Sequence, residues 1–173
     1  MYSKASIKGH PIHPILVGFP ITFYVLTFVG LCVYNFTSAD LFWYRLAFFS
    51  NMAAIATALV AAVPGFIDWA VGVPNKTEAK KDGLIHMTLN LLTLAIFIGN
   101  GLMMNGTWDQ PMNSLGSSII LTGVGCVLLM GAGYYGWTMV GIHKVGVSMS
   151  PEQEDIQERY ENKRPEEPPV VFH

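Results

Sequence analysis

Four long stretches of this chain contain no aspartate, glutamate, lysine or arginine. They cover residues 9–39, 46–67, 83–108 and 110–143. A helix needs about 20 residues to cross the hydrocarbon core of a bilayer, at a rise of about 1.5 Å per residue. Each stretch is long enough, so the sequence predicts four transmembrane helices, near residues 15–36, 44–67, 85–104 and 117–141.

The composition favours a membrane protein with a single folded domain. Hydrophobic residues make up 51% of the chain and charged residues 13%, whereas soluble domains carry about 25% charged residues. The net charge of -2 excludes a nucleic-acid partner, which needs a basic surface. We therefore expect an all-α, up-down bundle of four helices in the lipid bilayer over residues 1–148, followed by an acidic, proline-rich tail at 149–173.

The basic residues predict the orientation of the bundle, because lysine and arginine beside a membrane helix are retained on the cytoplasmic side. Nine of the ten basic residues lie before the first helix, between the second and third, or after the fourth, and only Arg45 lies on the other side. We predict that both termini are cytoplasmic and that the protein lies in a prokaryotic cytoplasmic (inner) membrane.

The tail begins with a helix-start signal. Ser150 and Pro151 precede Glu152 and Gln153, and proline is favoured at the first position of a helix. A short surface helix is expected from residue 151 to about 162. The tail is either a solvated end or an arm that lies along a partner subunit.

Four histidines and one carboxylate gather on one side of the predicted bundle. In an up-down path, the starts of odd helices and the ends of even helices share one leaflet, and there lie His10, His13, Asp68, His86 and His143. Ionisable groups at membrane depth are costly and usually functional, so this layer is the candidate site. The other side offers polar residues that we interpret as ordinary interface residues: Asp40, Arg45, Asn51, Asn100 and Asp109.

Local sequence adds detail to this layer. Asn90 lies one helical turn after His86, on the same face, where it can be a hydrogen-bond partner. His10 and His13 each precede a proline, which favours an extended backbone, and Pro14 can be the first helical residue. Helix four is rich in glycine, which allows close helix packing or the approach of a flat ligand such as a porphyrin. No internal sequence repeat is evident.

Four segments occur in an order that resembles the domain of unknown function 2231, an uncharacterised family of predicted membrane proteins. The segments are His10-Pro11-Ile12-His13-Pro14, Gly65-Phe66-Ile67-Asp68-Trp69, His86-Met87-Thr88-Leu89-Asn90 and His143-Lys144-Val145-Gly146-Val147. The resemblance covers residues 9 to about 147, and the family has glycine where this chain has Lys144. Similar membrane domains occur joined to Rieske iron–sulfur or c-type cytochrome modules, so the resemblance implies electron transfer.

The leading hypothesis is a redox-associated membrane subunit of an electron-transfer complex, rather than a free-standing enzyme. The chain has no C-x-x-C-H motif, and neither Cys32 nor Cys126 belongs to a C-x-x-C pair, so a redox centre must be held by histidine. Helices one and three are diagonal in the bundle, which makes His13 and His86 the preferred axial ligands of a b-type haem. Asn90 and His143 are the other two residues that we expect to take part in cofactor binding. A quinone is an alternative or additional ligand. No catalytic residue is predicted.

Two alternatives remain open. His10, His13, Asp68 and His86 provide the imidazole and carboxylate ligands that suit a divalent metal ion, zinc, iron or copper. The third hypothesis is a non-catalytic accessory subunit that packs against other membrane-protein subunits and uses its tail as a tether.

Overall fold

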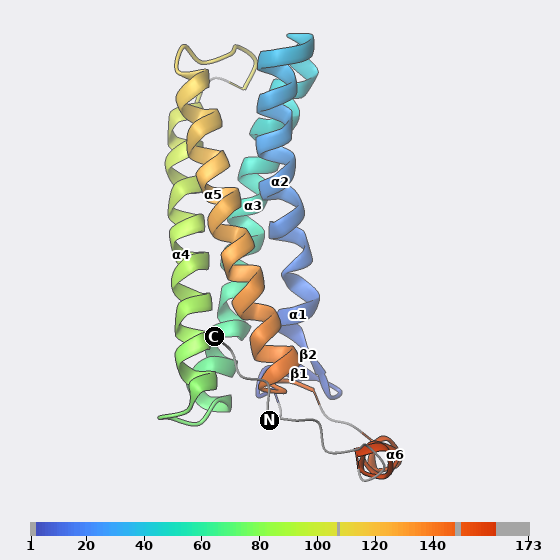
Figure 1. The fold of residues 1–173 in the computed structure, drawn as a ribbon. Helices are drawn as coiled ribbons and strands as arrows, with labels where there is room; N and C mark the ends of the chain where they lie inside the picture. Colours follow the sequence, from blue (N-terminus) through green and yellow to red (C-terminus); the bar gives the residue numbers. More distant parts are fainter. Residues whose placement is uncertain (1–2, 107, 148–149, 162–173) are drawn as a thin grey trace, which may run out of the picture.

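The structure is a computed structural model that describes residues 3–106, 108–147 and 150–161. Four long helical segments run side by side in an up-down bundle (Figure 1). The first segment comprises α1 (Ile12–Leu16), α2 (Gly18–Val33) and the π-helical turn η1 (Tyr34–Ser38), and the second comprises α3 (Leu41–Ile67) and η2 (Asp68–Gly72). The third is α4 (Glu78–Met104), and the fourth comprises α5 (Leu115–Trp137) and η3 (Thr138–Ile142).

Two further elements lie outside the bundle. A short antiparallel hairpin, β1 (Ser6–Ile7) and β2 (His10–Pro11), precedes α1. Its two-residue turn consists of Lys8 and Gly9, which both have positive φ, 50° and 82°, as a type I′ turn requires. The tail contains α6 (Pro151–Glu161), which confirms the expected helix. For the last ten residues the sequence predicts an extended backbone, and these residues lie outside the described ranges.

The four predicted spans are confirmed, and all four segments are long and apolar enough to cross a membrane. Each is longer than predicted. Segment three begins at Glu78 rather than near residue 85, because Thr77 caps it by accepting a hydrogen bond from Lys80 N at 3.2 Å. Segments two and four continue through the turns η2 and η3, so they end at Gly72 and Ile142.

The extended backbone predicted at His10 is confirmed, and the one predicted at His13 is wrong. His10 is extended, in β2, but His13 is helical, because α1 begins at Ile12 rather than at Pro14. Pro14 therefore lies in the first turn of the helix. There its missing N–H needs no partner, and the residue four positions earlier is outside the helix, so no helical carbonyl meets the proline ring.

Neighbouring helices pack closely. The helix α2 packs against α3 and α5, and α4 packs against the same two, so α2 and α4 are diagonal, as expected. Glycine allows the close approach of α4 and α5, because a Cβ on Gly125 would lie 2.6 Å from the ring of Phe97. At this position the packing interpretation of the glycines is confirmed.

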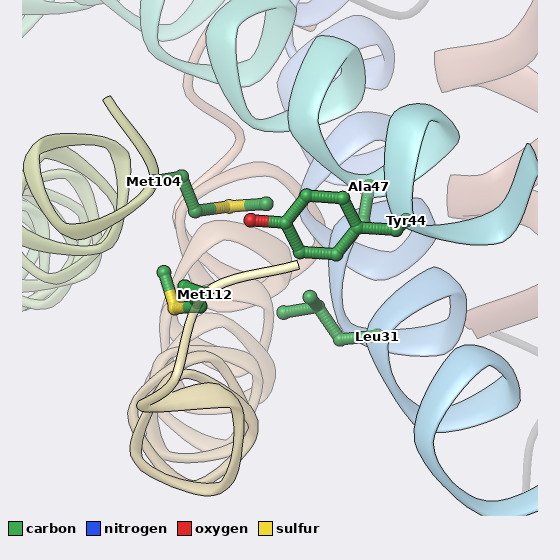
Figure 2. Packing of buried hydrophobic residues seen from close by; sticks show 5 residues of the cluster. All are labelled: Leu31, Tyr44, Ala47, Met104 and Met112. Atoms are coloured by element: carbon green, nitrogen blue, oxygen red, sulfur yellow. The ribbon is translucent and has the colours of Figure 1, made fainter. Parts of the chain in front are cut away.

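The end of the bundle opposite the histidines has an apolar core. Figure 2 shows the Tyr44 ring between Leu31 and the methionines, with its hydroxyl directed toward Met104. Met112 closes the cluster from the loop between α4 and α5, and Ala47 lies beside Tyr44 on α3. These side chains are buried, so this end of the bundle is tightly packed around Tyr44.

Two residues that we interpreted as ordinary interface residues are instead buried in the bundle. Asn51 and Asn100 are fully buried, as is Ser118. Asn100 Nδ2 donates to Asn51 Oδ1 at 2.9 Å, Asn51 Nδ2 donates to the Phe97 carbonyl at 3.0 Å, and the Ser118 hydroxyl donates to Asn100 Oδ1. The interface interpretation was wrong for both asparagines, because their helices turn these side chains inward, where three helices share one polar network.

Candidate functional site

The bundle brings two of the predicted site residues together. His13 on α1 and His86 on α4 come from diagonal segments and lie far apart in the sequence, yet their ring centroids are 6.3 Å apart. The ring planes are nearly perpendicular, at 87°. Both side chains are partly buried. Together they form what we call the imidazole pair.

Each imidazole is held by a backbone carbonyl of the next helix. His13 Nδ1 lies 2.9 Å from the carbonyl oxygen of Ala61 on α3, and His86 Nδ1 lies 2.7 Å from that of Ala132 on α5. A carbonyl oxygen only accepts hydrogen bonds, so Nδ1 carries the proton in both rings. In the neutral imidazole, the lone pair is then on Nε2, the atom that can bind a metal or accept a hydrogen bond.

Asn90 lies where the sequence predicted it, one turn beyond His86. Its Nδ2 donates to the His86 carbonyl at 2.9 Å and lies 3.2 Å from His86 Nε2. An amide NH₂ group is a donor, so this contact requires a lone pair on Nε2 and agrees with the tautomer set by Ala132. A metal on His86 Nε2 would replace the contact between Asn90 Nδ2 and Nε2, and the amide would keep its hydrogen bond to the His86 carbonyl.

Asp68 anchors the N-terminal segment. One carboxylate oxygen, Oδ1, accepts hydrogen bonds from Lys4 N at 2.7 Å and Ala5 N at 2.9 Å, and the Ser3 hydroxyl donates to both carboxylate oxygens at 2.9 and 2.8 Å. The next residue, Trp69, donates from Nε1 to the Lys80 carbonyl at 3.1 Å. The Asp-Trp dipeptide thus ties both the N-terminal segment and the start of α4 to the end of α3.

The structure does not gather the four residues that we named for a divalent metal. His10 is exposed on the hairpin, and Asp68 is surrounded by the hydrogen-bond donors of the N-terminal segment. Within the described ranges, no group of three or more histidine, cysteine, aspartate or glutamate side chains is placed to hold a metal ion. His13 and His86 are the two of these four residues for which the structure shows a close approach.

His143 pairs with a residue that sequence reasoning missed. Its Nε2 lies 2.7 Å from Asp82 Oδ2, and the two side chains are only 19% and 23% exposed. Asp82 precedes His86 by four residues, so both lie on one face of α4. That spacing was the available signal, but the predicted start of the helix at residue 85 left Asp82 in a loop. The pair fastens the end of the fourth segment to the start of α4.

Comparison with known proteins supports the membrane assignment. A family model described as "Predicted membrane protein (DUF2231)" matches residues 9–149, which is more than half of the chain. No curated protein and no solved structure matches the chain. The matched range contains the imidazole pair, Asp68 and the Asp82–His143 pair, whereas the hydrogen-bond donors to Asp68 precede it.

Proposed function

The chain belongs to the predicted membrane protein family DUF2231, and we propose that it is a redox-associated membrane subunit in which His13 and His86 hold a b-type haem. The observation that carries this proposal is the imidazole pair. Two helical segments that are diagonal in the bundle place two imidazoles with their centroids 6.3 Å apart, and the Nδ1–H of each donates to a carbonyl.

Two histidine nitrogens are a donor set that would hold one haem iron, and the two rings come close, with 6.3 Å between their centroids. Metal-binding histidines usually donate the other ring N–H to a carbonyl or carboxylate, and both rings have such an acceptor.

Bound haem supplies one-electron transfer between its ferric and ferrous states. The protein would orient the rings through the carbonyls of Ala61 and Ala132, and both rings are partly buried in the bundle. A quinone headgroup is the second ligand that we propose for this site, because the Nε2 lone pair of His86 can accept a hydrogen bond from a quinol hydroxyl.

The test is the optical spectrum of the purified full-length protein, oxidised and then reduced, together with elemental analysis and solvent extraction for quinone. We expect a low-spin b-type haem signal that both His13→Ala and His86→Ala abolish, because axial ligation takes both imidazoles. His10→Ala and His143→Ala are the matched controls and should at most shift the signal, since one ring is exposed and the other is paired with Asp82.

Other outcomes distinguish the alternatives. Stoichiometric zinc, iron or copper without a haem spectrum would favour the metal hypothesis, and extracted quinone without haem would favour the quinone. Wild-type protein that carries none of these would overturn the redox proposal. The non-catalytic accessory role is proposed only as a companion role: subunits of a larger complex should co-purify with the full chain and less with a chain that ends at Ser150.

We also propose that the protein lies in a prokaryotic cytoplasmic (inner) membrane with both chain termini in the cytoplasm, because nine of the ten basic residues flank the histidine end of the bundle. Reporter fusions at residues 40 and 110 should report the outer side, and fusions at residues 78 and 173 the inner side. The reverse pattern at either pair would contradict this orientation.

A further inference from the structure

In the first half of the bundle, which consists of segments one and two, two residues of α3 support the imidazole of His13. The Ala61 carbonyl accepts the Nδ1 proton of His13, and Gly65 lies one helical turn further along. A Cβ built on Gly65 would lie 2.7 Å from both Cε1 and Nδ1 of His13 and 3.2 Å from its Cγ. All three of these nearest atoms belong to the His13 ring.

The second half repeats this support on α5. The Ala132 carbonyl accepts from His86, and Gly136 follows four residues later. A Cβ on Gly136 would lie 3.0, 3.2 and 4.0 Å from Cε1, Nδ1 and Nε2 of His86. Although no repeat was evident in the sequence, Ala-x-x-x-Gly occurs at the same place in both halves, and in each half it faces a histidine of the preceding segment.

The four-residue spacing has a physical reason. In an α-helix the carbonyl of residue i points toward residue i+4, and side chains at these two positions lie one above the other. A side chain at i+4 would therefore cover the carbonyl of residue i from the side on which the imidazole approaches. Glycine leaves that side open, so the ring can lie over the glycine and reach the oxygen, which has a second lone pair available.

Helix packing alone does not account for these two glycines. A Cβ on Gly30 would meet Trp43 and Ala47, and a Cβ on Gly125 would meet Phe97 and Ile96, which are ordinary contacts of one helix against another. By contrast, the three atoms nearest to a Cβ on Gly65 all belong to the His13 ring, and the three nearest to a Cβ on Gly136 all belong to the His86 ring.

We propose that Gly65 and Gly136 are positioning residues of the imidazole pair: by leaving the carbonyls of Ala61 and Ala132 open, they hold the protons on Nδ1 and direct the Nε2 lone pairs to the bound ligand. The expected effect on haem binding rests on the proposed function. The expected effect on the tautomer and position of the two rings does not depend on haem.

The experiment compares Gly65→Ala and Gly136→Ala in the full-length protein with two controls on α5. Gly133→Ala is the neutral control, because nothing lies within 4 Å of a Cβ there, and Gly125→Ala is the packing control, because its Cβ would meet Phe97 at 2.6 Å. The readouts are histidine ¹⁵N NMR of the haem-free protein, which reports the tautomers, and haem affinity with the low-spin EPR signal of the loaded protein.

We expect Gly65→Ala and Gly136→Ala to lose the Nδ1–H tautomer of the facing histidine and to weaken haem binding about 10- to 100-fold, as loss of a partner that orients a ligating histidine does. Gly133→Ala should match the wild type, and Gly125→Ala should lower thermal stability while keeping tautomers and EPR signal. Wild-type tautomers in both test variants, or an equal change in Gly125→Ala, would overturn the inference. If the wild type binds no haem, the proposed function fails, and the NMR comparison still decides the positioning role.

Discussion

Asp68→Ala should release the N-terminal segment from the bundle. The carboxylate accepts from two backbone amides and the Ser3 hydroxyl, and hydrogen bonds to a charged group contribute about 1.5–3 kcal/mol each. Water can replace part of these bonds because the site is partly exposed, so we expect a net local loss of about 2 kcal/mol, which corresponds to roughly a 30-fold faster amide exchange. Hydrogen–deuterium exchange at Lys4 and Ala5 measures this change.

Asp68→Asn is the informative companion variant. It keeps an oxygen for both amides but removes the charge, and charge-assisted hydrogen bonds are about twice as strong as neutral ones, so its effect should lie between those of wild type and alanine. Asp40→Ala is the matched control. Asp40 caps α3 at the other end by accepting from Phe42 N at 2.8 Å, so its loss should cost about 1 kcal/mol without changing exchange at Lys4.

The same variants also address the metal hypothesis. If Asp68 is an anchor, elemental analysis of Asp68→Ala should match that of the wild type. Loss of a bound cation from both Asp68 variants, with unchanged exchange at Lys4 and Ala5, would contradict the anchor and favour a ligand role.

The four helices could be predicted because the absence of charge and the high hydropathy extend over the whole length of each span. Each charge-free stretch is long enough to span a bilayer, and the order of the spans alone places His13 and His86 at one end. Helix starts were less predictable. They depend on single capping contacts such as that of Thr77 with Lys80 N, and this contact brought Asp82 onto α4.

The rotation of each helix about its axis was the main limit of the sequence prediction. The four spans are apolar all round, so the sequence gives little indication of which face is inside. Asn51 and Asn100 could not be distinguished from lipid-facing or interfacial residues until the packing was known. The Ala-x-x-x-Gly supports were missed for the same reason, because their meaning lies in the histidine that faces them across the bundle.

Asn100→Leu should destabilise the bundle by about 1–3 kcal/mol, the cost of leaving buried polar groups without partners. Asn100 joins two other residues: its Nδ2 donates to Asn51 Oδ1, and its Oδ1 accepts from the Ser118 hydroxyl. Both partners are fully buried. Reversible unfolding in detergent micelles measures the loss. Asn105→Leu is the matched control and should change stability by less than about 0.5 kcal/mol, because Asn105 is exposed at the end of α4.

The double variant Asn51→Leu with Asn100→Leu separates a coupled network from two independent contacts. Replacing both partners of a buried hydrogen bond by apolar groups costs less than removing one of them. The remaining Ser118 hydroxyl can turn to the carbonyl of Ser114, four residues earlier, because serine in a helix often makes this bond. We therefore expect the double variant to lose less stability than the sum of the two single losses. Strict additivity would contradict the network. If the protein binds haem as proposed, its spectrum should be the same in all three variants, because the network lies toward the end of the bundle opposite the imidazole pair.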